Sequence, residues 1–158
     1  DEVLALLKQY PVSKGFMVEI GGEIGTVGVR ADDTPWKIGI QQPDAAPGTL
    51  SATINLTTQA MATSGDYFNF FEVGGVRYSH TIAPLTARPV THALTSTVVI
   101  TENCAEADAW ATALLVLGPD QAYDIAIEHN LAVMLFERTD TGISSQQTPA
   151  FNQAVVKE

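Results

Sequence analysis

The segment between residues 52 and 101 most constrains the fold of this chain, because it is rich in Thr, Val, Ile and aromatic residues. Branched and aromatic side chains favour β-strands, and Gly and Pro residues divide the segment into short runs. We expect strands at residues 51–57, 67–73, 76–82 and 96–101, with residues 59–63 leading into a Ser-Gly-Asp turn at 64–66. The second and third of these strands form a predicted hairpin around Gly74 and Gly75.

Helical patterns come mainly after this segment. Asn103 is suited to cap a helix over residues 104–117, with Glu106 three positions later, and Gly118 ends it. We also expect helices at 1–10 and 119–130, and strands at 15–20, 24–30, 36–40 and 131–136, whereas the polar tail after residue 139 carries no predicted element. Predicted strands dominate the first two thirds of the chain, and helices come late. This order indicates one α+β domain, residues 1–158, with a largely antiparallel sheet and helices packed on it.

The charge of the chain excludes one class of partner. Eight Lys and Arg residues against 18 Asp and Glu residues give a net charge of −10, and the basic residues form no stripe. A duplex nucleic acid requires clustered basic residues, so we expect no nucleic-acid partner. No apolar run of eighteen residues occurs, so no transmembrane segment is predicted, and Cys104 is the only cysteine, which rules out an internal disulfide.

Polar residues gather between residues 62 and 84, inside the strand-rich segment, where an unpaired buried polar group costs about 1–3 kcal/mol. This stretch is therefore the first place to look for a site. It contains His80, and histidine is the side chain that normally titrates near neutral pH. His80 is either a base in a site or a hairpin histidine held by a hydrogen bond.

Two other patterns could carry chemistry. Asp108 and Thr112 are spaced i, i+4 on the predicted helix, so they share one face, and small Ala residues surround them. A carboxylate with a hydroxyl suits Mg²⁺ or Ca²⁺, although a solvated helix Asp beside an ordinary Thr explains the spacing equally. Gly21 and Gly22, between two predicted strands, either admit a ligand or form a tight hairpin turn.

Four ordered motifs, the third of which has two parts, resemble the FAD:protein FMN transferases of the ApbE family. Residues 16–24 (Phe-Met-Val-Glu-Ile-Gly-Gly-Glu-Ile) match a family strand, and residues 36–43 resemble the next one. Residues 62–67 (Ala-Thr-Ser-Gly-Asp-Tyr) and 78–84 (Tyr-Ser-His-Thr-Ile-Ala-Pro) match the family's Thr-Ser-Gly-Asp-Tyr and Ser-His-Ile-Ile-Asp-Pro segments. Residues 107–114 (Ala-Asp-Ala-Trp-Ala-Thr-Ala-Leu) match its Ala-Asp-Ala-Leu-Ala-Thr-Ala-Leu helix. The resemblance spans nearly the whole chain and corresponds to the C-terminal portion of a family member.

The resemblance implies an enzyme of the same fold that transfers FMN from FAD to a Thr or Ser of an acceptor protein and releases AMP. It implies Mg²⁺ as cofactor, held by Asp108 and Thr112 with a backbone carbonyl from upstream, and His80 as the base for the acceptor hydroxyl. The residues it implies for flavin binding are Gly21, Gly22, Glu23, Thr63, Ser64, Gly65, Asp66 and Tyr67. It also implies a periplasmic or lipid-anchored location.

The chain departs from the family pattern at two positions. Ala83 stands where the family usually has Asp, and Ala87 stands where it has Gly. Loss of a carboxylate three residues from His80 removes a possible partner of that side chain. Two alternatives therefore stay open: an FAD pyrophosphatase that forms FMN and AMP, and a non-catalytic relative that binds flavin.

Overall fold

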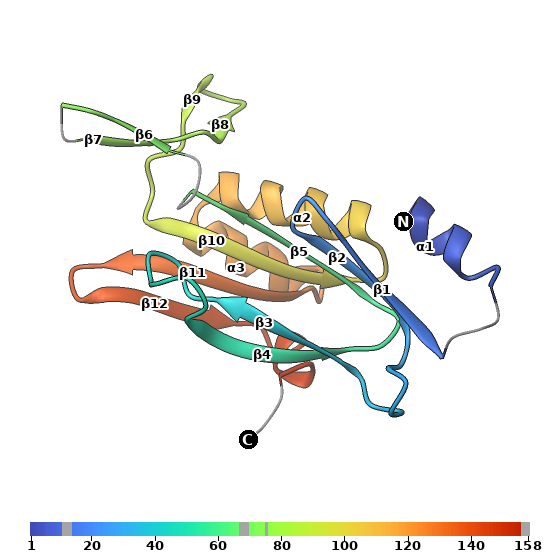
Figure 1. Ribbon diagram of the computed structural model, residues 1–158. Helices are drawn as coiled ribbons and strands as arrows, with labels where there is room; N and C mark the ends of the chain where they lie inside the picture. The colour runs from blue at the N-terminus through green and yellow to red at the C-terminus, as the bar shows by residue number, and fades with distance from the viewer. Residues whose placement is uncertain (11–13, 67–69, 75, 156–158) are drawn as a thin grey trace.

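The computed structural model describes residues 1–10, 14–66, 70–74 and 76–155. Within these ranges the largest sheet has six strands in the order β1-β2-β5-β10-β11-β12, and every neighbouring pair is antiparallel (Figure 1). The strands are β1 (Gly15–Ile20), β2 (Glu23–Gly28), β5 (Ala60–Gly65), β10 (Leu94–Thr101), β11 (Ala132–Thr139) and β12 (Gly142–Gln147). The predicted α+β class with a large antiparallel sheet is confirmed.

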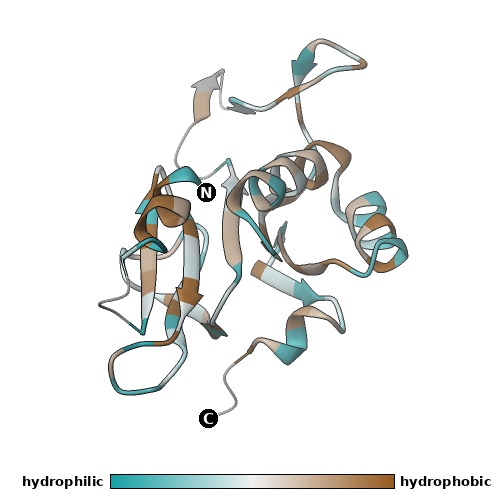
Figure 2. Cartoon of the chain, turned by 90° about the vertical axis from the view of Figure 1, so that its right-hand side faces the viewer, coloured by the Kyte–Doolittle hydropathy of each residue, from teal (hydrophilic) through white to brown (hydrophobic). Residues whose placement is uncertain are grey.

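Helices cover one face of this sheet. Helix α2 (Cys104–Leu117) lies against β5 and β10, and α3 (Pro119–Glu128) contacts α2 and β11. Seen from the side, α2 and α3 lie together on one side of the chain (Figure 2). The short helix α1 (Glu2–Leu7) contacts β1 and β2 at the other end of the sheet. None of the helices described is long and apolar enough to cross a membrane.

A ribbon of β3 (Trp36–Gln41) and β4 (Leu50–Leu56) lies against the opposite face of the sheet, with the 3₁₀ turn η1 (Phe151–Gln153) beside it (Figure 1). Strand β10 serves both sides: Val98 and Ile100 belong to the core facing the ribbon, and Val99 belongs to the core facing α2. This alternation follows from the two-residue period of a strand. The cores on both faces fix the position of β10 and of its neighbour β5.

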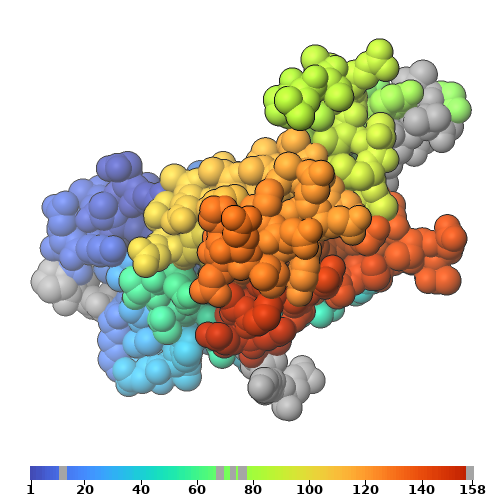
Figure 3. Space-filling model, turned by 180° about the vertical axis from the view of Figure 1, so that it is seen from behind, coloured from blue at the N-terminus to red at the C-terminus, as the bar shows by residue number. Residues whose placement is uncertain are grey.

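A two-part extension, here named the arm, runs from residue 70 to residue 92. It contains the hairpin β6 (Phe70–Val73) and β7 (Val76–Ser79), then the short pair β8 (Ile82–Ala83) and β9 (Arg88–Pro89). The arm extends beyond the ends of β5 and β10 and stands off the rest of the molecule (Figures 1 and 3). The predicted hairpin is confirmed for these residues, but its second strand ends at Ser79 and not at residue 82. Residues 67–69 and Gly75 lie outside the described ranges.

Two details of the sequence analysis need correction. The turn predicted at 64–66 is wrong, because Ser64 and Gly65 continue β5 and pair with Thr97 and Ser96 of β10. Strand β12 was not predicted; it pairs with β11 at the edge of the sheet, and three of its six residues are both exposed and polar. An edge strand of this kind has no apolar alternation by which a sequence could reveal it. Helix α2 has the predicted bounds, and the Asn103 side chain accepts a hydrogen bond from the Glu106 amide.

Candidate functional site

A cavity of about 550 Å³ lies where the β1–β2 turn, β5, α2 and the arm meet. Its lining includes residues from each of these elements, which are far apart in sequence. Of the site residues predicted from the sequence, the described structure places these around the cavity: Gly21, Gly22, Glu23, Thr63, Ser64, Gly65, His80, Asp108 and Thr112. The fold thus brings together the predicted metal ligands, the predicted base and most of the predicted flavin residues.

Helix α2 presents Asp108 and Thr112 to this cavity because of its periodicity. Ala107 and Ala111 are fully buried against the sheet, and each is followed by one of the two polar residues, which are exposed. Thr97 of β10 donates a hydrogen bond from its hydroxyl to the Ala111 carbonyl (2.6 Å), which ties the middle of the helix to the sheet. The small alanine side chains allow α2 to approach β5 closely.

Strand β5 meets the same face of α2. The Ser64 Oγ and the Thr112 Oγ1 lie 2.8 Å apart and share a hydrogen bond. Thr63 and Gly65 also line the cavity, so both sides of this part of β5 contribute to it. The sequence suggested Ser64 as a flavin contact. In the structure, its hydroxyl forms a hydrogen bond with Thr112, one of the two predicted metal ligands.

The Gly21–Gly22 pair forms the turn between β1 and β2, where Ile20 pairs with Glu23. Its φ angles are +72° and +106°, the left-handed region that favours glycine. The tight-turn interpretation is therefore confirmed, and the same two residues also line the cavity. A Cβ on Gly21 would lie 2.8 Å from the Glu23 Oε2, whereas one on Gly22 would meet nothing within 4 Å.

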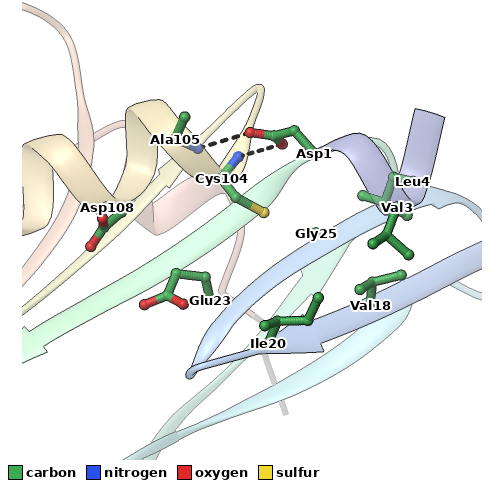
Figure 4. Close-up of a pocket in the computed structure, with 10 residues that line it drawn as sticks. All are labelled: Asp1, Val3, Leu4, Val18, Ile20, Glu23, Gly25, Cys104, Ala105 and Asp108. Carbon is green, nitrogen blue, oxygen red and sulfur yellow. Dashed lines mark hydrogen bonds between the residues drawn. The ribbon is translucent and has the colours of Figure 1, made fainter. Parts of the chain in front are cut away.

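A second, mostly apolar pocket of about 320 Å³ adjoins the first, between α1, β1 and the start of α2 (Figure 4). Glu23 and Asp108 line both pockets, and Figure 4 shows their carboxylates at the same end. At the other end, the Asp1 carboxylate accepts hydrogen bonds from the amides of Cys104 (2.9 Å) and Ala105 (3.0 Å). Asp1 thereby satisfies two of the unpaired amides at the N-terminus of α2.

Asp66 does not line the cavity. Its buried carboxylate accepts hydrogen bonds from the Arg138 guanidinium and from the Thr95 hydroxyl. The structure therefore gives no support to the prediction that Asp66 contacts flavin, because those oxygens are directed to protein partners. Tyr67, the other flavin residue predicted beside it, lies outside the described residues.

On α2 and the facing part of β5, the side chains around the cavity that could bind a metal ion offer oxygen atoms. Among the described residues, no group of three or more His, Cys, Asp or Glu side chains is placed to hold a metal. A cation here would therefore combine the Asp108 carboxylate with neutral oxygens such as the Thr112 hydroxyl. Such a mixed oxygen set fits a hard divalent cation and does not fit zinc.

Comparison with known proteins identifies the family. The model of the ApbE family matches residues 1–135. The chain belongs to the ApbE family. It is 34% identical over 158 residues to the FAD:protein FMN transferase of Escherichia coli (strain K12), covering 100% of this chain and 45% of that protein. It is 40% identical over 154 residues to the enzyme of the same name from Haemophilus influenzae, covering 97% and 44%.

Solved ApbE structures have the same fold. The apo form of the Pseudomonas stutzeri flavinyl transferase ApbE superposes with a TM-score of 0.85 at 36% identity, covering 98% of this chain and 47% of that one. The flavin transferase ApbE from Vibrio cholerae gives 0.82 at 35% identity, covering 97% and 48%. The chain thus spans about half the length of the relatives that it matches.

The two departures from the ApbE pattern both lie on the arm. The Ala83 carbonyl in β8 accepts hydrogen bonds from the amides of Thr86 (3.2 Å) and Ala87 (2.9 Å). Ala87 has φ of +53°, a conformation that glycine adopts without steric cost. This conformation gives a physical reason for the glycine of the family pattern, and alanine is strained there.

Sequence reasoning missed two residues near the site. Thr81 lines the cavity beside His80, and its amide donates to the Ser79 Oγ (3.1 Å), which bends the chain around the histidine. The sequence could have indicated Thr81, because this residue lies inside the segment 78–84 that resembles the family pattern. Arg138 was also missed, and a single Arg in a strand gives no indication of a partner 72 residues away.

Proposed function

We propose that this chain forms part of a Mg²⁺-dependent enzyme that transfers FMN from FAD to a Thr or Ser hydroxyl of an acceptor protein and releases AMP. The observation that carries the proposal is the meeting of Asp108, Thr112 and His80 around one cavity. The names of the similar ApbE proteins support flavin transfer to a protein. The metal, the acceptor residue and the release of AMP are part of the proposal.

The α2 face supports the choice of metal. Asp108 and Thr112 would hold Mg²⁺ through oxygen atoms, which this ion prefers. When bound, Mg²⁺ neutralises charge on phosphate oxygens, the main requirement of phosphoryl transfer. Asp108 also supplies negative charge that draws a cation to this end of the cavity, and the neighbouring Glu23 carboxylate adds to that charge.

Ser64 would orient the Thr112 hydroxyl. A threonine that offers its oxygen to a cation must donate its proton elsewhere, and the Ser64 Oγ at 2.8 Å can accept it. The β5 backbone fixes Ser64 through its pairing with β10. The sheet would thereby set the orientation of the Thr112 hydroxyl on α2. Hydrogen bonds from residues that do not touch the metal commonly orient metal ligands in this way.

His80 would act as the base. It is exposed, lines the cavity from the arm, and is followed by Thr81 on the same wall. In the proposed step the acceptor oxygen forms a bond to the FMN phosphorus, the bond from that phosphorus to the AMP oxygen breaks, and His80 takes the hydroxyl proton. General-base catalysis of this kind typically contributes about 10²–10⁴-fold.

The cavity also suits part of a large nucleotide. Its volume of about 550 Å³ lies within the range of small-molecule sites. Gly22 leaves the backbone of the β1–β2 turn uncovered on one wall, so a ligand can approach it closely. Because His80 is exposed, water could reach the same base, and this observation favours FAD hydrolysis to FMN and AMP as the second candidate function.

The test uses the full-length gene product, FAD, MgCl₂ and a candidate acceptor domain. Flavin bound to the acceptor is followed by in-gel fluorescence, and AMP is measured by chromatography. Fluorescent acceptor with an equal amount of AMP supports transfer. AMP with free FMN supports hydrolysis instead, and the absence of both products contradicts catalysis and leaves the non-catalytic interpretation.

A further inference from the structure

Arg138 of β11 joins two segments that are distant in sequence. Its Nη1 and Nη2 donate to the Asp66 Oδ2 (2.9 Å) and Oδ1 (2.8 Å), and its Nε donates to the Asp44 Oδ2 (2.8 Å). The Asp66 side chain is only 11% exposed and that of Arg138 is 28% exposed. A bidentate, partly buried pair of this kind is among the stronger interactions in proteins and fixes geometry as well as distance.

The same cluster fixes the two points at which the chain leaves the sheet before the arm and rejoins it after the arm. The chain leaves the sheet at Asp66, whose amide donates to the Thr95 carbonyl (2.9 Å) and whose carboxylate accepts from the Thr95 hydroxyl (2.6 Å). The chain returns to the sheet through Ala93, whose carbonyl accepts from the Arg138 amide (2.9 Å). Arg138 therefore binds Asp66, the last described residue before the arm, through its side chain, and Ala93, the first residue after the arm, through its backbone. We name the set Asp66, Thr95 and Arg138 the root clamp.

The electrostatics of the root clamp favour its charged form. The hydrogen bonds to Asp66 raise the pKa of Arg138 above its ordinary value, and this effect outweighs partial burial, which acts in the opposite direction. The Thr95 side chain is fully buried, so its hydroxyl exchanges little with water. The pair is thus shielded more than an exposed salt bridge, whose contribution is usually small.

The position of His80 explains why the ends of the arm matter. His80 lies on the arm between β7 and β8, while Asp108 and Thr112 lie on α2. Because the arm stands off the molecule (Figures 1 and 3), a rotation about its ends changes the position of His80 relative to the α2 face. The Phe71–Tyr78 ring stack (5.2 Å between centroids) stiffens the arm internally and does not fix its direction.

We propose that Asp66 and Arg138 are positioning residues, which fix the ends of the arm so that His80 stays opposite the Asp108 and Thr112 face of α2. This inference rests on the proposed function and assigns Asp66 a role different from flavin binding. It accounts for a buried carboxylate next to a site that it does not enter. A displacement of about 1 Å in a reacting group can lower a rate about 100-fold, so the clamp acts on the chemical step.

The first test compares Asp66→Asn, Arg138→Lys and Arg138→Ala in the full-length gene product. We expect kcat to fall about 10–100-fold for Asp66→Asn and Arg138→Ala, and less for Arg138→Lys, with KM for FAD changed less than about 3-fold. Millimolar guanidinium should partly restore kcat of Arg138→Ala, and urea at equal concentration should not. Asp44→Asn is the matched control, because it removes a carboxylate from the same guanidinium without touching the ends of the arm.

The second test measures amide hydrogen exchange and does not depend on activity. Asp66→Asn should speed exchange within the arm at least about 10-fold while α2 and β10 keep wild-type protection. Unchanged kcat and unchanged arm exchange in Asp66→Asn overturn the proposal, and so does equal loss of protection in the arm and α2, which indicates general destabilisation. If the wild-type protein transfers no flavin, the proposed function fails, whereas the exchange data still decide whether the clamp holds the arm.

Discussion

The Ser64 and Thr112 hydroxyl oxygens lie 2.8 Å apart although 48 residues separate them in sequence. This contact joins the cavity-facing part of β5 to the α2 face that carries Asp108. It couples the sheet, whose position is fixed by cores on both sides, to the predicted metal ligands on the helix. The geometry of these ligands therefore depends on the strand as well as on the helix.

Ser64→Ala should weaken the response to Mg²⁺ without abolishing activity. Loss of the proposed acceptor for the Thr112 proton removes a hydrogen bond of about 1 kcal/mol, so the Mg²⁺ concentration for half-maximal activity should rise about 5-fold. The rate at saturating Mg²⁺ should change little. Titration of activity with MgCl₂ measures both quantities. Ser51→Ala, at an exposed position of β4, should match wild type; an unchanged Mg²⁺ titration for Ser64→Ala would contradict the orienting role.

Asp108→Asn should lower flavin transfer by at least about 100-fold, because it removes the carboxylate proposed to hold the cation that offsets phosphate charge. Isothermal titration with MgCl₂ should show weakened binding in parallel. Chelation of the wild-type protein with EDTA should reproduce the loss, and added Mg²⁺ should reverse it. Asp120→Asn, in the first turn of α3, tests whether loss of any helix carboxylate has this effect. Wild-type turnover in Asp108→Asn would refute the metal assignment.

The local elements of this fold could be predicted well from the sequence. Helix α2 has strong local boundaries in Asn103 and Gly118, and the β1–β2 hairpin has a glycine pair where both φ angles are positive. The helix ends and the glycine turn depend on residues that are close in sequence, so the residue types and their spacing are enough to predict them. The i, i+4 spacing of Asp108 and Thr112 likewise sufficed to place both on one helix face.

Features that depend on distant partners could not be predicted. The Ser-Gly-Asp segment has turn-forming residues, yet pairing with β10 keeps Ser64 and Gly65 in a strand. Asp66 belongs to a motif that indicated flavin binding, whereas its carboxylate meets Arg138 from β11. A single sequence does not show which charged residues pair across such distances, because the energy of an ion pair depends on tertiary distance and burial.

Asp1→Asn should destabilise the start of α2. The Asp1 carboxylate accepts from two amides at the helix N-terminus, where negative charge also interacts favourably with the helix dipole. The amide side chain keeps one acceptor oxygen and loses the charge, so we expect a loss of about 0.5–1 kcal/mol in the free energy of unfolding. Urea denaturation at low and high salt measures the change, which should shrink at high salt. Glu2→Gln provides the neighbouring exposed carboxylate as control; equal effects of the two substitutions would count against a specific cap.

Ala87→Gly should stabilise the arm, because the residue has φ of +53°. A side chain in this region costs about 1–2 kcal/mol, and the larger backbone entropy of glycine offsets about half of the gain, so we expect a net increase of about 0.5–1 kcal/mol. Slower amide exchange at β8 and β9 measures the change locally. Ala83→Gly is the matched control: Ala83 lies in β8 and is not among the residues with positive φ, so the same substitution there should speed exchange. Faster exchange in both variants would show that strain at Ala87 is outweighed by the flexibility of glycine.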